Sequence, residues 1–246
     1  MSLSVVIITK NEERNVGECL KKVSFCDEII VVDDESSDKT RIIAKSLSAK
    51  VFTRPSNKNI SDQYNYGAKK AKCDWILFIN ADEEVTDELK NEILNTIKDA
   101  KYAAYNLSRK DYLFGQWIRH GETAHFKAIR LIKKGEGKWV RRVHEYVETG
   151  ARVGNLINPL QHYPHRNLTE YINSINRWSE WHALANYEEG KRSNIAKILF
   201  YPTFKFIDNY VLKLGFLDGI PGFLIALIMS FHSFCAWSSL WLYQRK

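Results

Sequence analysis

The sequence predicts an α/β fold, a parallel sheet with helices on both faces, followed by a helical C-terminal extension. Short apolar runs alternate with segments of helical spacing over the first hundred residues. This order is typical of parallel strands joined by right-handed crossovers. Each apolar run ends in polar residues. Much later, residues 219–244 contain no formally charged side chain.

Four strands are predicted in the first half. Leu3–Thr9 is rich in β-branched residues, a second strand is expected at 28–32, and the continuous apolar run at 75–79 indicates a strand buried on both faces. A shorter strand is expected at 51–53. The expected helices, where apolar residues recur at helical spacing, cover about 16–23, 39–47, 60–71 and 86–100.

The second half changes character. Strands are expected at 103–107 and 128–132, and a charged, glycine-containing turn at 133–138 is a hairpin signal. Residues 139–147 are predicted to form one extended segment. A loop at 161–166 leads into a further helix. We expect two domains, a catalytic domain at 1–165 and a helical extension at 166–246.

The net charge of +7 indicates an acidic partner, such as nucleic acid, a phosphorylated substrate or an anionic membrane. The four cysteines form no CxxC pair, so reduced thiols are the simplest account. The first apolar run is short and is followed at once by charged residues, so we expect no signal peptide.

The C-terminal extension has a composition suited to a membrane surface. The uncharged stretch is long enough to cross a bilayer, but Pro221, Gly222 and several serines make it poorly hydrophobic. Trp237 and Trp241 resemble interfacial anchors. Upstream, lysine and arginine alternate with aromatic residues, which fits an anionic membrane surface. A helical extension packed on the catalytic domain, or a dimer interface, is the alternative.

Polar residues gather at the carboxyl ends of three predicted strands, where open α/β sheets bind ligands. They lie at 9–12, 33–38 and 80–84. Hard oxygen donors of this kind suit Mg²⁺ or Mn²⁺ and, through the ion, a nucleotide diphosphate. The alternative for 80–84 is an acidic turn that caps the next helix. A dehydrogenase domain is excluded, because residues 10–13 contain no glycine-rich turn.

Three segments, Val-Ile-Ile-Thr-Lys-Asn-Glu at 6–12, Val-Val-Asp-Asp-Glu-Ser-Ser-Asp at 31–38 and Ile-Asn-Ala-Asp-Glu at 79–83, together resemble family 2 glycosyltransferases of the GT-A fold. Later segments, among them Gly-Gln-Trp-Ile at 115–118 and Val-His-Glu at 143–145, are similar to the lipopolysaccharide core heptose β-1,4-glucosyltransferase branch. Those enzymes are bacterial and act peripherally at the cytoplasmic face of the inner membrane.

The resemblance implies a site for a UDP-sugar and a divalent ion. Asp82 would be the metal ligand, and His162 would complete the metal shell. The residues that would line the uridine and donor-sugar pocket are Thr9, Asn11, Glu12, Asp34, Asn65, Asn80 and Asp82. One departure stands out: the family's usual motif is Asp-x-Asp, and this chain has Asn80 at the first position. The asparagine keeps an oxygen but loses a full negative charge.

Inverting transfer needs a carboxylate that removes the acceptor hydroxyl's proton. Glu145 is the candidate base, and the alternative is a salt bridge between Glu145 and Arg141 or Arg142. We therefore expect transfer of a sugar, glucose being the expected one, from a UDP-sugar to a membrane-anchored glycolipid such as the lipopolysaccharide inner core, with no nucleic acid partner. The rivals are transfer to polyprenyl phosphate, nucleotidyl transfer, and a non-enzymatic membrane-surface scaffold with a decayed site.

Overall fold

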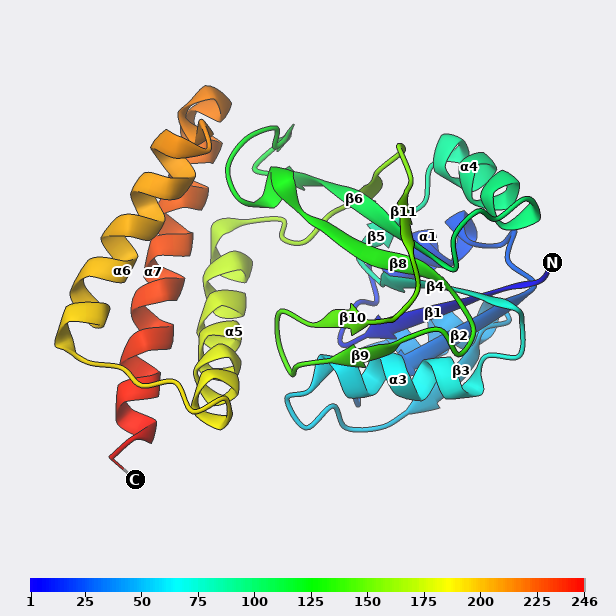
Figure 1. Cartoon of the computed structure of the whole chain (residues 1–246), viewed down its shortest axis with the longest axis horizontal. Helices are drawn as coiled ribbons and strands as arrows, with labels where there is room; N and C mark the ends of the chain where they lie inside the picture. Colours follow the sequence, from blue (N-terminus) through cyan, green and yellow to red (C-terminus); the bar gives the residue numbers. More distant parts are fainter. Residues whose placement is uncertain (246) are drawn as a thin grey trace. The chain divides into compact units, whose positions relative to one another are not determined.

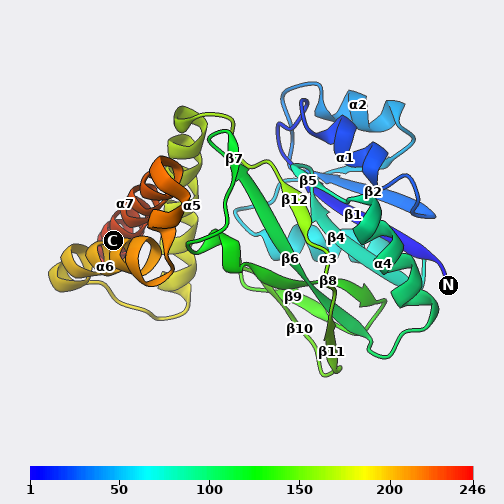
Figure 2. The same ribbon diagram turned by 90° about the horizontal axis from the view of Figure 1, so that it is seen from above.

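The computed structural model describes residues 1–245, and the chain folds into two compact units (Figures 1 and 2). The sheet unit comprises residues 1–109, 127–141 and 145–162. The helical unit comprises residues 110–126 and 142–144 and the chain from Tyr163 onward. The chain therefore passes between the units several times. The last passage lies between His162 and Tyr163, and the division into domains at 1–165 and 166–246 stays a prediction.

Four parallel strands form one half of the sheet, as predicted, in the order β3-β2-β1-β4. Their register brings three strand ends together, because Thr9 pairs with Asp33 and Ile8 pairs with Asn80. The polar loops that follow these strands therefore meet at one edge of the sheet. The four strands are β1 (Leu3–Thr9), β2 (Glu28–Asp33), β3 (Lys50–Thr53) and β4 (Trp75–Asn80).

Helices cover both faces of these strands (Figure 2). Alternate residues of a strand point to opposite faces, so Val5 and Ile7 pack with α1, α2 and α4, while Val6 packs with α3. Gly67 lets α3 approach closely, because a Cβ at that position would lie 2.3 Å from the Val6 side chain. The four helices are α1 (Val16–Lys22), α2 (Thr40–Ser46), α3 (Ile60–Lys70) and α4 (Asp87–Lys98).

The other half of the sheet is mostly antiparallel, with one parallel pairing between β11 and β6, so the sheet is mixed rather than parallel throughout. β8 pairs with β4, and β6 pairs with β8 on its other side, each antiparallel. Two short strands, β5 and β12, form a further antiparallel pair. The remaining strands are β5 (Glu83–Glu84), β6 (Ala104–Leu113), β7 (Gln116–Trp117), β8 (Lys127–Lys133), β9 (Lys138–Val140), β10 (Tyr146–Glu148), β11 (Val153–Asn155) and β12 (Leu160–His162).

The prediction of one extended segment over 139–147 is wrong. The structure has an antiparallel pair, β9 and β10, joined by a turn at 141–145. Arg141 (φ 73°) and His144 (φ 54°) adopt the left-handed conformation, which an extended strand cannot contain. Glu145, the candidate base, therefore follows a turn and precedes β10.

The helical unit is built from three helices, α5 (Leu168–Glu188), α6 (Ile195–Ile207) and α7 (Gly219–Tyr243). α7 packs against both α5 and α6 (Figure 1). Pro202 lies inside α6, and its carbonyl accepts a hydrogen bond from Ser230 Oγ of α7 at 2.8 Å. By length and composition alone, one helical stretch, Gly215–Tyr243, is long and apolar enough to cross a membrane among the described residues.

Candidate functional site

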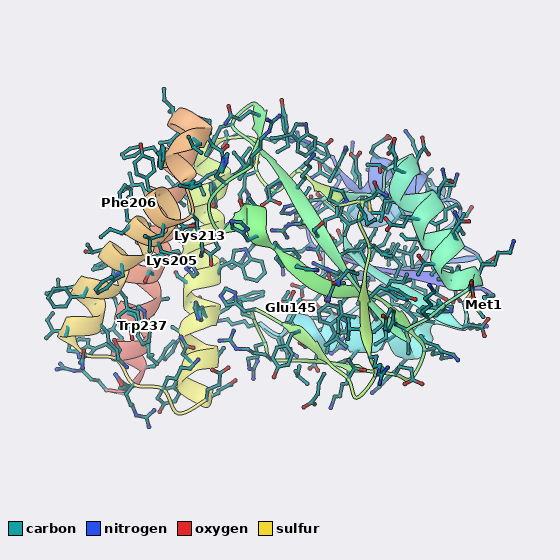
Figure 3. The ribbon with its side chains drawn as sticks, turned by 45° about the horizontal axis from the view of Figure 1, so that its top comes forward. Met1, Glu145, Lys205, Phe206, Lys213 and Trp237 are labelled. Carbon is teal, nitrogen blue, oxygen red and sulfur yellow. The ribbon has the colours of Figure 1, made fainter. Side chains whose placement is uncertain are left out.

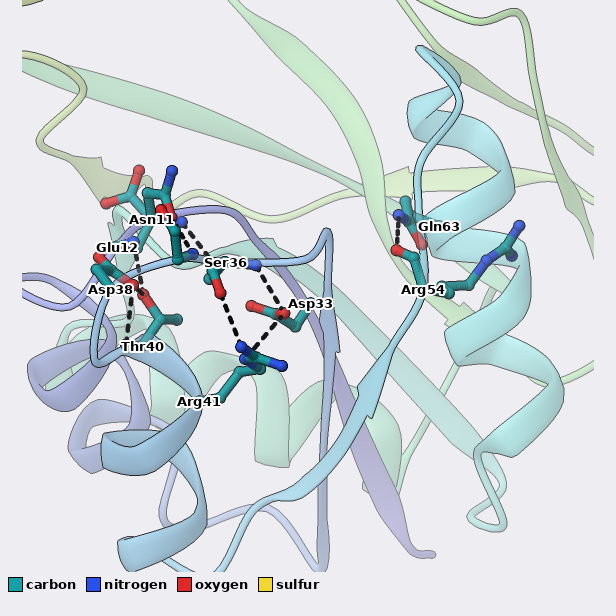
Figure 4. Close-up of polar contacts among 10 residues, drawn as sticks. Asn11, Glu12, Asp33, Ser36, Asp38, Thr40, Arg41, Arg54 and Gln63 are labelled. Atoms are coloured by element: carbon teal, nitrogen blue, oxygen red, sulfur yellow. Dashed lines mark hydrogen bonds and ion pairs between the residues drawn. The ribbon is translucent and has the colours of Figure 1, made fainter.

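The loops that follow β1 and β2 are joined by hydrogen bonds from backbone amides (Figure 4). Asn11 N donates to Ser36 Oγ, Ser37 N donates to Asn11 Oδ1, and Glu12 N donates to Thr40 Oγ1, each at 2.8 Å. Asn11 has φ 55°, a conformation that asparagine tolerates better than most residues. The predicted site residue Asn11 therefore holds the shape of this edge.

The structure gives Asp34 partners for both carboxylate oxygens. Ser56 N donates to Oδ1 at 2.6 Å, and Ser56 Oγ and Lys10 Nζ each donate to Oδ2 at 2.9 Å. By contrast, Thr9 Oγ1 and Asp33 Oδ1 are buried and have no hydrogen-bond partner among residues 1–245. Because buried polar atoms are normally paired, these two atoms are candidates for ligand contact. The sequence-based prediction included Thr9 but passed over Asp33.

Asn80 is held by a buried network that the sequence did not reveal. Tyr64 Oη donates to Asn80 Oδ1 at 2.5 Å and accepts from Arg130 Nη1 at 2.6 Å. Burial raises the pKa of Tyr64, so its hydroxyl keeps the proton that it donates. The Asn80 amide oxygen is thus already engaged on the protein side.

Glu83 is the charged centre of this network. Its side chain is completely buried. Asn80 N donates to Oε2 at 2.8 Å, and Arg130 Nη2 and Arg109 Nη1 lie 3.5 and 3.7 Å from Oε1. Two arginines beside one carboxylate compensate its burial. Glu83 therefore fixes the loop after β4.

Replacing Glu83 by alanine is expected to lower the free energy of unfolding by about 3–5 kcal/mol, because it leaves buried arginine charge without its partner. Denaturant unfolding of the purified protein measures this change. Glu84→Ala, one residue along at a more exposed position, is the matched control. It is expected to change the free energy of unfolding by less than about 1 kcal/mol. Equal losses in both variants would contradict the assigned role of Glu83.

Asp82 and His162 come together because β5 pairs with β12, which places His162 opposite Glu83. His162 Nε2 lies 3.3 Å from Asp82 Oδ2. Asp82 Oδ1 is buried and has no hydrogen-bond partner in the described part of the chain. Burial acts to raise the pKa of Asp82, but His162 and Arg109 outweigh it, so that pKa is lowered and the carboxylate is ionised.

Glu12 belongs to the same cluster. Burial, and then the charge of Asp82, raise the pKa of Glu12 to about 7. Glu12, Asp82 and His162 therefore converge from the ends of β1, β4 and β12, although they are far apart in the sequence. The structure thus brings both predicted metal ligands into contact.

These residues fit a divalent ion that is shared with a substrate. Among residues 1–245, no group of three or more His, Cys, Asp or Glu side chains is arranged to hold a metal by itself. Mg²⁺, however, is usually bound by one or two carboxylates together with substrate phosphates and water. The unpaired Asp82 Oδ1, with His162 beside it, provides such a partial shell.

Asn65 has a contact with the backbone of β9. Its Nδ2 donates to Trp139 O at 2.8 Å, and Trp139 N donates to its Oδ1 at 3.0 Å. The ring of Tyr64 stacks on Trp139 with centroids 4.4 Å apart. These contacts tie β9 to α3, and a role for Asn65 at the donor sugar stays a prediction.

Glu145 lies at the end of the turn between β9 and β10, and its side chain is partly buried (Figure 3). Burial raises the pKa of Glu145 above the usual value of 4.5, while Arg130 acts in the opposite direction and Glu83 in the same direction. Its carboxyl group is therefore within electrostatic reach of the network behind Asn80. A raised pKa makes this carboxylate a stronger base.

The helical unit contains a pocket of about 570 Å³. Asp218 shapes it by accepting hydrogen bonds from Arg119 N at 3.0 Å and His120 N at 2.8 Å. Aromatic rings can pack against sugars, and the guanidinium group of an arginine can bind phosphates. The lining residues are Tyr112, Gly115, Gln116, Trp117, Arg119, Leu217, Asp218 and Gly219.

Two known glycosyltransferases are similar to this chain over most of its length. The chain is 27% identical over its whole length to the lipopolysaccharide core biosynthesis glycosyltransferase LpsC of Rhizobium meliloti, and covers 93% of that protein. It is 28% identical to an uncharacterized glycosyltransferase of Rickettsia typhi, over 94% of this chain and 84% of that protein.

The fold is shared with a solved structure, that of S. aureus TarS 1-349, with a TM-score of 0.52 and 14% identity. The match covers 100% of this chain and 92% of that one. The predicted GT-A architecture is confirmed. Residues 4–213 match the family model described as glycosyl transferase family 2. This chain therefore belongs to glycosyl transferase family 2 and is a glycosyltransferase.

Proposed function

We propose that this enzyme transfers a sugar from a UDP-sugar to a membrane-anchored glycolipid, with inversion at the anomeric carbon and with the help of Mg²⁺ or Mn²⁺. The convergence of Glu12, Asp82 and His162 beside the joined loops carries the proposal. Glucose is the proposed sugar, as the resemblance to heptose glucosyltransferases implies. We retain 1–165 as the proposed catalytic domain and 166–246 as the proposed membrane-associating extension.

The donor nucleotide would lie along the edge formed by the ends of β1, β2 and β4. Thr9 Oγ1 and Asp33 Oδ1, which have no hydrogen-bond partner among residues 1–245, would bond the uridine there. Asn11 and Glu12 would line the same pocket. Asp34 accepts three hydrogen bonds, only one of them at Oδ1, and a carboxylate has about four acceptor positions, so Asp34 can also accept a hydrogen bond from the uracil imide.

The metal would be held by Asp82 and His162, with Asn80 near the ribose. When bound, the ion stabilises the negative charge that builds on the leaving diphosphate. The chain's part is to keep Asp82 ionised, through His162 and Arg109. The loop that carries Asp82 is held by Glu83.

Glu145 would remove the proton from the acceptor hydroxyl as its oxygen attacks the anomeric carbon. UDP departs from the opposite face, so the product has the inverted configuration. The burial that raises the pKa of Glu145 favours its taking a proton. The position of Glu145 after the 141–145 turn is maintained by Ser61, whose Oγ donates to the carbonyl of Arg141.

The acceptor is proposed to be a glycolipid of the lipopolysaccharide inner core, at the cytoplasmic face of the bacterial inner membrane. The Rhizobium meliloti relative, which bears lipopolysaccharide core biosynthesis in its name, supports this class of acceptor. The net charge of +7 suits both the acceptor's phosphates and an anionic membrane. The aromatic pocket of the helical unit offers a place for a phosphorylated sugar.

Stabilisation by ligand tests the donor and the metal together. UDP is expected to stabilise the protein by about 2.7 kcal/mol at a hundred times its dissociation constant. Thermal unfolding measures the effect, and Mn²⁺ is expected to enlarge it. CDP and GDP are the controls. A scaffold with a decayed site would show no shift with UDP, and a shift without any effect of Mn²⁺ would contradict the metal assignment.

A further inference from the structure

We propose that α6 and α7 lie flat in the surface of an anionic bilayer, with their exposed apolar sides in the lipid, and that neither helix crosses it. The observations come from the helical unit alone. The inference rests on the proposed function in one respect: it says how the enzyme reaches an acceptor that is anchored in the membrane.

α7 carries an exposed apolar stripe along its length. Ile220, Phe223, Leu227, Phe231 and Phe234 are spaced three or four residues apart and so lie on one face. Their exposed fractions are 75, 42, 50, 45 and 43%. Five large apolar side chains in a row, each exposed by at least two fifths, are a surface that water solvates poorly.

α6 carries a second stripe, which continues beyond its end. Phe200, Phe204, Ile207 and Val211 recur at the same spacing and are 60, 68, 41 and 49% exposed. α6 contains no buried residue. Rings of the two helices meet where Phe206 contacts Phe223, with centroids 5.9 Å apart. Phe206 can be found on α6 in Figure 3.

We call these nine side chains the apolar surface. They are Phe200, Phe204, Ile207, Val211, Ile220, Phe223, Leu227, Phe231 and Phe234.

The charges beside the apolar surface favour a lipid surface over another protein. Residues 191–245 contain six lysines and arginines but two acidic residues. One of these acids, Asp208, pairs with Lys213 at 2.6 Å, and the other, Asp218, bonds His120. Lys191 and Lys205 pair with Glu189 and Glu122, outside this range, and the other three cations, Arg192, Lys197 and Arg245, would attract anionic lipid. A second copy in a two-fold dimer would instead bring like charges together.

Three of these cations lie over aromatic rings at the end of the helix pair where α6 begins and α7 ends. Arg192 lies over Tyr187, Lys197 over Trp237 and Arg245 over Trp241, at 5.6, 5.0 and 3.7 Å from the ring centroids. Aromatic rings with cations beside them are typical of the headgroup region of a bilayer. This end is therefore suited to the interface itself.

The packing of α7 argues against its spanning the membrane. Its 25 residues would measure about 37 Å, enough to cross a hydrocarbon core of about 30 Å. However, α7 packs on α5, and Tyr243 Oη donates to Glu180 of that helix at 3.4 Å. α5 also carries Glu170, Arg177 and Glu188. A spanning α7 would draw such charges into the hydrocarbon, whereas a flat α7 leaves α5 in water.

Sedimentation with vesicles of phosphatidylglycerol and phosphatidylcholine tests the surface in the full chain. Phe204→Glu and Leu227→Glu are each expected to weaken binding roughly tenfold or more. Ile42→Glu is the matched control, because Ile42 is 69% exposed on α2, against 68% for Phe204, and lies outside the apolar surface. It is expected to bind like the wild type. Equal effects in all three variants, or none, would overturn the proposal.

Stabilisation by UDP, measured in the same variants, separates this proposal from the proposed function. If vesicle binding falls while stabilisation by UDP persists, the apolar surface binds the membrane independently of the donor site. If no protein responds to UDP but vesicle binding follows the pattern above, only the proposed donor is wrong. Sedimentation velocity without vesicles tests the alternative, that the apolar surface binds a second copy of the chain. Loss of a dimer in Phe204→Glu with unchanged vesicle binding would overturn the membrane assignment.

The flat orientation has its own test. With an epitope tag at each end of the chain, protease is added to inverted inner-membrane vesicles and to spheroplasts. A flat helix pair leaves both tags on the cytoplasmic side, so both are cleaved in the vesicles and both are protected in the spheroplasts. Tags on opposite sides would show that the chain crosses the membrane and would overturn the proposal.

Discussion

Replacing Glu145 by glutamine is expected to lower kcat by about a hundred- to ten-thousand-fold, the range that general base catalysis contributes. The substitution keeps the size of the side chain and its ability to hydrogen-bond, but removes the proton acceptor. Steady-state turnover of UDP-glucose with a glycolipid acceptor measures the loss. KM for the donor is expected to stay nearly constant, because Glu145 is proposed to act on the acceptor.

Glu148→Gln is the control for this change. Glu148 lies three residues further on, exposed in β10, and is expected to tolerate the substitution. Turnover that survived in Glu145→Gln would favour the polyprenyl phosphate alternative, in which the attacking lipid phosphate is already ionised and needs little help from a base.

The pH dependence gives a second measurement on the same residue. The base acts in its ionised form, so turnover falls as the pH drops through the pKa of Glu145. Because burial raises that pKa, the acidic limb of kcat/KM is expected above the usual glutamate value of 4.5. The limb should be absent from the residual activity of Glu145→Gln.

Replacing Asp82 by alanine is expected to reduce metal-dependent turnover by about a hundred- to a thousand-fold, because it removes a ligand of the proposed ion, and the ion stabilises the charge on the leaving diphosphate as an oxyanion-hole donor would. Asp82 offers the buried, unpaired oxygen of the cluster with Glu12 and His162. The variant is also expected to lose the part of the UDP stabilisation that depends on Mn²⁺. Turnover across a Mn²⁺ titration and thermal unfolding measure the two effects.

Asp87→Ala serves as the control, since Asp87 is an exposed acidic residue in the first turn of α4, five positions away. It removes the same charge from nearby without touching the cluster. Full metal-dependent turnover in Asp82→Ala would refute the proposed role of this aspartate and, with it, the proposed metal site.

The parallel half of the fold could be predicted because its signals are local. Continuous apolar runs predict β1 and β4, and the alternation of strands with helices predicts that the strands are parallel. The meeting of Thr9, Asp33 and Asn80 follows from the parallel register. The same register predicts that Glu12 and Asp82 lie near each other, since each residue follows closely after one of these strand ends.

The second half gave weaker signals because its strands pair over long distances. Nothing in the sequence of β12 says that it will pair with β5, so the contact between His162 and Asp82 could be proposed only from the family resemblance. The turn at 141–145 depends on left-handed residues, Arg141 and His144, that are not glycine and therefore give no warning in the sequence.

Asn80, which replaces the first aspartate of the family's Asp-x-Asp motif, shows most clearly what the sequence decides and what the tertiary structure decides. The sequence by itself determined the strand that ends there, the acidic residues that follow and the missing charge. Only the tertiary structure decided how Asn80 is used: its amide oxygen accepts from Tyr64, which Arg130 holds in turn, beside the buried Glu83. These side chains come from α3, β8 and β5, and their meeting depends on burial and long-range strand pairing that no local pattern encodes.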